Sequence, residues 1–89
     1  MEIKDEIVRG QDAKRILNEP LYNEAFDTVK NGIVSAMMQS GIGDNETHNR
    51  LVISLQLLEQ VKRALQNVME TGQMAEIQVK EKSFLKRVF

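Results

Sequence analysis

The feature that most constrains the fold is one long amphipathic run from Asn45 to Thr71, followed by Gly72. Apolar residues recur there three or four positions apart, which places them on one face of a continuous α-helix. We name this row the leucine stripe. Its apolar members are Leu51, Leu55, Leu58, Leu65 and Met69, and Lys62 interrupts the row between Leu58 and Leu65. About 27 residues predict a rod of roughly 40 Å, with the stripe serving as core or as an interface between copies.

The size of the chain favours self-association. Eighty-nine residues predict a single domain with a small core. The chain has no cysteine, so disulfides and thiolate metal sites cannot strengthen that core. Association between copies is the remaining common remedy. We therefore expect a homo-oligomer.

The charge and aromatic content disfavour nucleic acid and membrane partners. The formal net charge is −1, so the chain has no strong basic field for a nucleic acid. Aromatic residues make up 4% of the chain, which leaves few platforms for stacking bases. No apolar stretch approaches the ~20 residues of a membrane span, and the N-terminus is too polar for a signal peptide. We expect a soluble protein of the cytoplasm.

Two further helices precede the long run. Met1–Asn18 has helical spacing, and Gly10 is expected to kink or divide that helix. Pro20 disfavours helix at the residue before it and suits the first turn of the next helix, Pro20–Gln39. The N-terminal helix is expected to buttress the other two.

The stretch Ser40–Asp44 predicts a tight turn. It contains two glycines, and Asp44 or Asn45 can cap the helix that follows. So short a connection makes its flanking helices antiparallel. The predicted fold is therefore all-α: a hairpin of Pro20–Gln39 against Asn45–Thr71, with residues 1–72 as a helical domain and residues 73–89 as a C-terminal docking arm.

The arm has two possible structures and two possible uses. Gln73–Lys80 alternates partly like a short strand, but it also fits a helix continued after a kink. Apolar side chains left in water forfeit about 1.5–3 kcal/mol each, so we expect the arm to dock on its own hairpin or on a partner. Contact of its cations with a nucleic-acid backbone is the less favoured alternative. The predicted partner-binding residues are Phe84, Leu85, Lys86, Arg87, Val88 and Phe89.

No pattern of residues predicts catalysis, a cofactor or a metal. His48 is the only histidine, so a metal site lacks the convergent ligands it needs. Asp44 and Glu46 resemble the start of a calcium loop, but the later glycine and glutamate are missing. Gly41–Gly43 is too short for a phosphate loop, and no serine has an evident base. The chain is expected not to be an enzyme.

Short motifs along the chain resemble small helical proteins of tailed bacteriophages, encoded beside genes for head assembly and DNA packaging. They are Ala13–Pro20, Glu24–Phe26, Glu70–Gly72 and Phe84–Val88. The resemblance covers roughly Gln11–Phe89. It implies a viral assembly or packaging component that acts in the host cytoplasm or within the virion.

Three functions remain open at this point. The first is a non-enzymatic structural or adaptor protein that self-associates or docks on a phage protein. The second is a DNA-binding packaging component of the small-terminase type, although Glu2–Asn18 lacks the basic charge expected of its DNA-binding segment. The third is a small inhibitor of a host protein.

Overall fold

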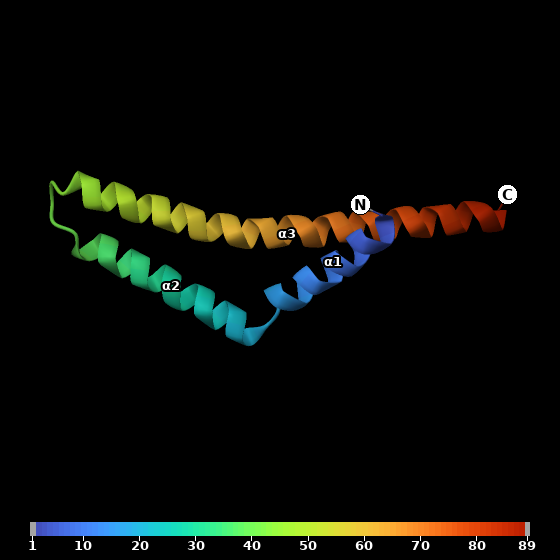
Figure 1. The fold of residues 1–89 in the computed structure, drawn as a ribbon, viewed down its shortest axis with the longest axis horizontal. Helices are drawn as coiled ribbons and strands as arrows, with labels where there is room; N and C mark the ends of the chain where they lie inside the picture. The colour runs from blue at the N-terminus through green and yellow to red at the C-terminus, as the bar shows by residue number, and fades with distance from the viewer. Residues whose placement is uncertain (1, 89) are drawn as a thin grey trace. The chain divides into compact units, whose positions relative to one another are not determined.

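The structure, a computed structural model, describes residues 2–88 and is all-α over that range. Helix α1 spans Ile3–Leu17, α2 spans Pro20–Gln39 and α3 spans Asn45–Val88, and no strand occurs among these residues (Figure 1). The predicted all-α class is confirmed. So is the helix start at Pro20, which occupies the first turn of α2.

The chain divides into two compact units. The first, which we call the crossing unit, consists of Met1–Leu17 and Ala64–Phe89. The second, the hairpin unit, consists of Asn18–Arg63. Helix α3 contributes residues to both units.

Helix α3 is longer than the sequence predicted. It is continuous through Lys62, as expected, but it passes Gly72 without interruption and runs for 44 residues, about 66 Å. The prediction that the helix ends at Gly72 is wrong. Gln73–Lys80 is helical, so the helical alternative for the arm is the one found. No proline follows Asn45, and the residues after Gly72 are mostly good helix formers, which explains why the helix continues.

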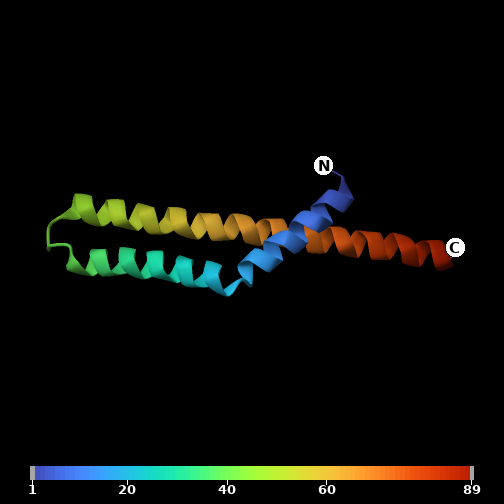
Figure 2. The ribbon, with the colours of Figure 1, turned by 60° about the horizontal axis from the view of Figure 1, so that its bottom comes forward.

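Helices α1 and α3 cross within the crossing unit (Figures 1 and 2). Gly10 and Gly72 lie at their contact. A Cβ on Gly10 would lie 2.7 Å from the Cα of Gly72, and a Cβ on Gly72 would lie 2.8 Å from the backbone oxygen of Glu6. Ala13 and Ala75 are each only 3% exposed. Gly10 does not divide the helix, because α1 is continuous through it, and this glycine permits a close backbone approach.

The hairpin unit pairs α2 with the first part of α3. The Lys30 ammonium lies 3.3 Å from a carboxylate oxygen of Glu59. The Lys62 ammonium lies 4.5 Å from the centre of the Phe26 ring, within the range of a cation–π interaction. Phe26 is 7% exposed and is the one large apolar side chain that is buried among the described residues.

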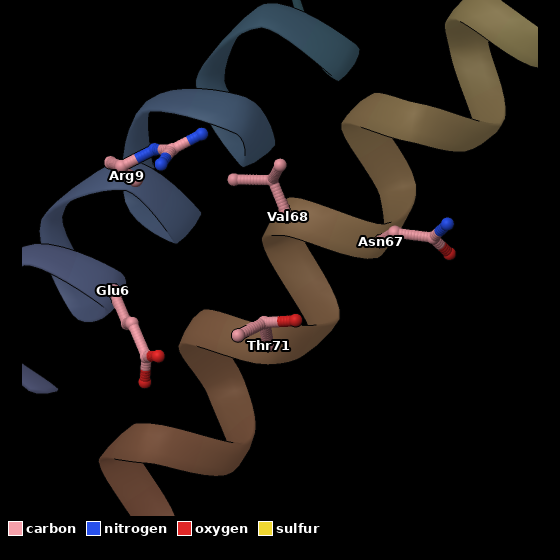
Figure 3. A pocket seen from close by; sticks show the side chains of 5 residues that line it. All are labelled: Glu6, Arg9, Asn67, Val68 and Thr71. Carbon is pink, nitrogen blue, oxygen red and sulfur yellow. The ribbon is translucent and has the colours of Figure 1, made fainter. Parts of the chain in front are cut away.

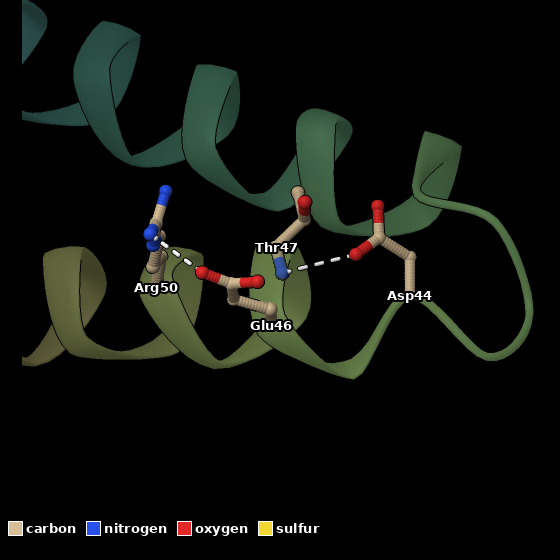
Figure 4. A network of polar contacts seen from close by, with 4 residues as sticks. All are labelled: Asp44, Glu46, Thr47 and Arg50. Atoms are coloured by element: carbon tan, nitrogen blue, oxygen red, sulfur yellow. Dashed lines mark hydrogen bonds and ion pairs between the residues drawn. The ribbon is translucent and has the colours of Figure 1, made fainter.

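The predicted turn at Ser40–Asp44 is confirmed, since α2 ends at Gln39 and α3 begins at Asn45. Gly43 adopts a φ of 95°, which favours glycine. Asp44 is the residue that caps α3: its carboxylate accepts a hydrogen bond of 3.2 Å from the backbone N–H of Thr47 (Figure 4).

The buried core of the described residues is small. It contains three apolar side chains, those of Ala13, Phe26 and Ala75, and no buried charge. The hydroxyl of Tyr22 is buried and has no hydrogen-bond partner within residues 2–88. A fold with so little buried apolar volume gains little free energy from burial within one copy.

Candidate docking surfaces

The C-terminal arm is an exposed helical segment. Every described side chain from Ile77 to Arg87 is exposed. Four large apolar side chains on α3 from Met74 onward are between 52% and 65% exposed. They are Met74, Ile77, Phe84 and Leu85. Their spacing places them on one side of the helix, and we call them the arm face.

Polar residues accompany the arm face. Ile77, Phe84 and Leu85 line a shallow hollow together with Lys80 and Glu81. The predicted binding residues Lys86 and Arg87 are exposed near the end of α3. The side chain of Val88 and the whole of Phe89 lie outside the described residues. The arrangement is that of an amphipathic helix, which can insert its apolar side into a groove on another protein.

The leucine stripe is half-buried along its whole length. Leu51, Leu55, Leu58 and Lys62 share one face of α3 by their spacing, and Lys62 meets Phe26 of α2. Leu65 and Met69 belong to the crossing unit. They line two different hollows that α1 residues also line, and neither side chain is fully exposed.

A hollow lies between α1 and α3 in the crossing unit (Figure 3). Glu6 and Arg9 border it from α1, and Val68 and Thr71 border it from α3. Asn67 completes the lining and points away from α1 in Figure 3. The hollow is open, and the exposed Arg9 and Thr71 leave it in contact with solvent.

A second apolar surface lies on the hairpin unit. The side chains of Leu21 and Val29 on α2, and of Leu57 and Val61 on α3, are between 50% and 69% exposed. This surface was not predicted from the sequence, because it depends on which sides of α2 and α3 face each other. The available signal was the width of the apolar sector of α2, which extends well beyond one stripe.

The described residues contain no cluster of metal ligands and no helix that could span a membrane. His48 is exposed, and no group of three or more His, Asp or Glu side chains within residues 2–88 is placed to hold a metal ion. Over the same residues, none of the helices is both long enough and apolar enough to span a membrane.

The chain matches no known protein family, no curated protein sequence and no solved structure.

Proposed function

We propose that this chain is a non-enzymatic structural or adaptor protein that self-associates and docks on a protein partner through its arm. The exposed arm face is the observation that carries the proposal. An isolated helical segment of about a dozen residues is marginal in water, and most helices are stabilised by covering an apolar side. Binding of the arm in a groove of another protein would supply that cover.

The proposed setting is virion assembly or DNA packaging of a bacteriophage, within the host cytoplasm or the virion. Its support is the resemblance of Ala13–Pro20 and Phe84–Val88 to small phage proteins. The small core adds support for an adaptor, because a chain that buries three apolar side chains among its described residues gains stability by covering its exposed apolar surface with a partner.

A matched pair of variants tests docking by the arm. Phe84→Glu places a charge on the arm face, whereas Ser83→Glu places the same charge one residue away, about 100° around the helix. The full chain and both variants are immobilised and exposed to a lysate of infected bacteria. We expect the wild type and Ser83→Glu to retain a virion or packaging protein in stoichiometric amount. Phe84→Glu should retain at least about tenfold less of that protein.

The same experiment has two contradicting outcomes. Equal retention by Phe84→Glu and the wild type would show that the arm face does not dock. Stoichiometric retention of a host protein in place of a phage protein would favour the inhibitor of a host protein. Self-association is tested separately by sedimentation equilibrium, where a strict monomer up to about 100 μM would contradict it.

Binding of DNA by the arm is the second candidate, because four cations within eight residues are exposed on one helix. By helical spacing, Lys80 and Arg87 lie on one flank of the arm face and Lys82 and Lys86 on the other. A duplex bound on one flank would therefore contact two cations. The logarithm of its association constant would then fall linearly with the logarithm of the salt concentration, with a slope of about −2. Titration of labelled duplex tests this, and binding that is unchanged in Lys86→Ala/Arg87→Ala would exclude it.

A further inference from the structure

One side of the hairpin unit is apolar and uncovered. We call it the hairpin face, and it comprises residues from both helices of the unit. These are Leu21, Ala25, Val29, Gly32 and Ala36 of α2 and Ser54, Leu57 and Val61 of α3. All eight are exposed, and none is charged.

The ion pair between Lys30 and Glu59 marks the opposite side of the hairpin unit. Each residue of an α-helix turns about 100° from the last, so Leu57 and Val61, two residues to either side of Glu59, point about 160° away from it. Around α2, the small residues Ala25 and Gly32 lie about 140–160° from Lys30 by the same rule. The two apolar rows therefore lie together, on the side that the ion pair does not occupy.

The opposite side, which we call the polar side, carries charged and amide groups beside the exposed Val34 and Met38 of α2, about 40° and 80° from Lys30. Lys30, Glu59 and Arg63 line a hollow there together with Leu55, Gln56 and Gln60. The contacts of Lys30 with Glu59 and of Lys62 with Phe26 set the register of the two helices. In that register Val61 of α3 lies beside the helical turn that follows Ala25 in α2. The apolar residues of the two helices therefore form one continuous surface.

The hydroxyl groups at the hairpin face are already satisfied within their own helices. Ser54 donates a hydrogen bond of 2.9 Å to the carbonyl oxygen of Arg50. Thr28, at the edge of the face, donates one of 2.8 Å to the carbonyl oxygen of Glu24. Covering these side chains would therefore leave no hydroxyl donor unpaired, which removes the usual penalty of burying them.

From these observations we propose that the hairpin face is the surface on which two copies of the chain pair, forming a bundle of four helices. The inference rests on the self-association in the proposed function and names its surface. A two-fold dimer brings the same surface of each copy together, so that surface must be complementary to itself. An uncharged face does so without repulsion between like charges.

Shape and size also fit a second copy. The large side chains of Leu57 and Val61 can pack against the small residues Ala25, Gly32 and Ala36 of the other copy, as in helix bundles. Two helices of about 30 Å by 10 Å give a face of roughly 600 Å². Stable interfaces bury about 600–1,000 Å² per partner, so the face reaches the lower end of that range.

Two double variants of the full chain test the inference. Leu57→Glu/Val61→Glu charges the hairpin face, and Gln56→Glu/Gln60→Glu adds the same charges, at the same spacing, to the polar side. We expect the wild type and the polar-side variant to be dimers by sedimentation equilibrium. The dimer dissociation constant of Leu57→Glu/Val61→Glu should be about 100-fold or more above that of the wild type. In dilute solution this face variant should keep the helical circular dichroism signal of the wild type.

A cysteine reporter covers the case in which the face variant fails to fold. The chain has no cysteine of its own, so Ala25→Cys and Gln56→Cys each carry a single thiol. We expect alkylation of the Ala25→Cys thiol by iodoacetamide to slow as protein concentration rises, and alkylation of the Gln56→Cys thiol to keep a constant rate.

The remaining outcomes separate this inference from the proposed function. A wild type that stays monomeric would overturn both the self-association and the hairpin face as its surface. A wild-type dimer that survives in Leu57→Glu/Val61→Glu, with alkylation of Ala25→Cys independent of concentration, would overturn the hairpin face alone. Dissociation of the dimer by Phe84→Glu, without any effect of the face variant, would assign pairing to the arm instead.

Discussion

Gly10 of α1 and Gly72 of α3 meet so closely that a Cβ on either residue would lie 2.7 Å from the Cα of the other. The neighbouring atoms are backbone atoms, which cannot rotate away as a side chain can. The contact therefore depends on the absence of a side chain at both positions.

Gly72→Ala is expected to destabilise the protein by about 1–3 kcal/mol, although alanine is the better helix former by about 1 kcal/mol. Urea unfolding at one fixed protein concentration measures the change. Gly41→Ala is the control, because nothing lies within 4 Å of a Cβ there and its φ is not positive. The control should be neutral or slightly stabilising. Equal stability of Gly72→Ala and the wild type would show that the backbones of α1 and α3 can move apart without a cost in free energy.

The adjacent residues Leu57 and Leu58 lie on different sides of α3. Leu58 is half-buried in the leucine stripe, whereas Leu57 is 57% exposed on the hairpin face. Leu58→Ala should cost about 1–3 kcal/mol at every protein concentration, somewhat less than full burial would give. Leu57→Ala should cost little in dilute solution and more as concentration rises. Thermal unfolding over a concentration series measures both, and a loss below about 0.5 kcal/mol for Leu58→Ala would mean that the buried face is wrongly assigned.

Tyr22→Phe is expected to stabilise the protein by about 1 kcal/mol. The Tyr22 hydroxyl is buried without a partner in residues 2–88, and an unmet buried donor carries a desolvation cost. The ring stays in place, 6.3 Å from that of Phe26 between centroids. Urea unfolding measures the gain. A clear loss of stability would mean that the hydroxyl makes a hydrogen bond in solution.

The interaction between Lys62 and Phe26 can be isolated by a double-mutant cycle. Lys62→Gln and Phe26→Leu each remove one partner, and the double variant removes both. We expect a coupling free energy of about 0.5–1 kcal/mol, as for partly exposed cation–π pairs. Lys30→Gln, which breaks the ion pair with Glu59, is the control and should show no coupling with Phe26→Leu.

Local signals in the sequence predicted most of the secondary structure. Pro20 marked the start of α2, the two glycines before Asp44 marked the turn, and the four-three spacing marked α3. These signals act within a few residues, so they could be read without knowledge of the fold. The class of fold followed from them.

The errors arose where a residue acts through a distant one. Gly10 and Gly72 both suggested helix breaks, because glycine is unfavourable within an isolated helix. Their partner is 62 positions away in the sequence, so only the tertiary structure shows that each makes room for the other. Lys62 interrupts the leucine stripe for a similar reason, because its ammonium group lies over the ring of Phe26 on another helix. The apolar side chains of the arm were recognised from the sequence, but the hairpin face needed the register of α2 and α3.

The small number of buried apolar side chains has a calorimetric consequence. The heat-capacity increment of unfolding comes mainly from hydration of apolar surface that folding had hidden, and it is normally about 12–15 cal/mol/K per residue. Among the described residues, a single copy buries one phenylalanine and two alanines and leaves the leucine stripe half-buried. Its heat-capacity increment should therefore fall below that range, and its melting should span a broad temperature interval. Assembly would raise the increment and sharpen the melting curve, so calorimetry reports how much of the folded state is made between molecules.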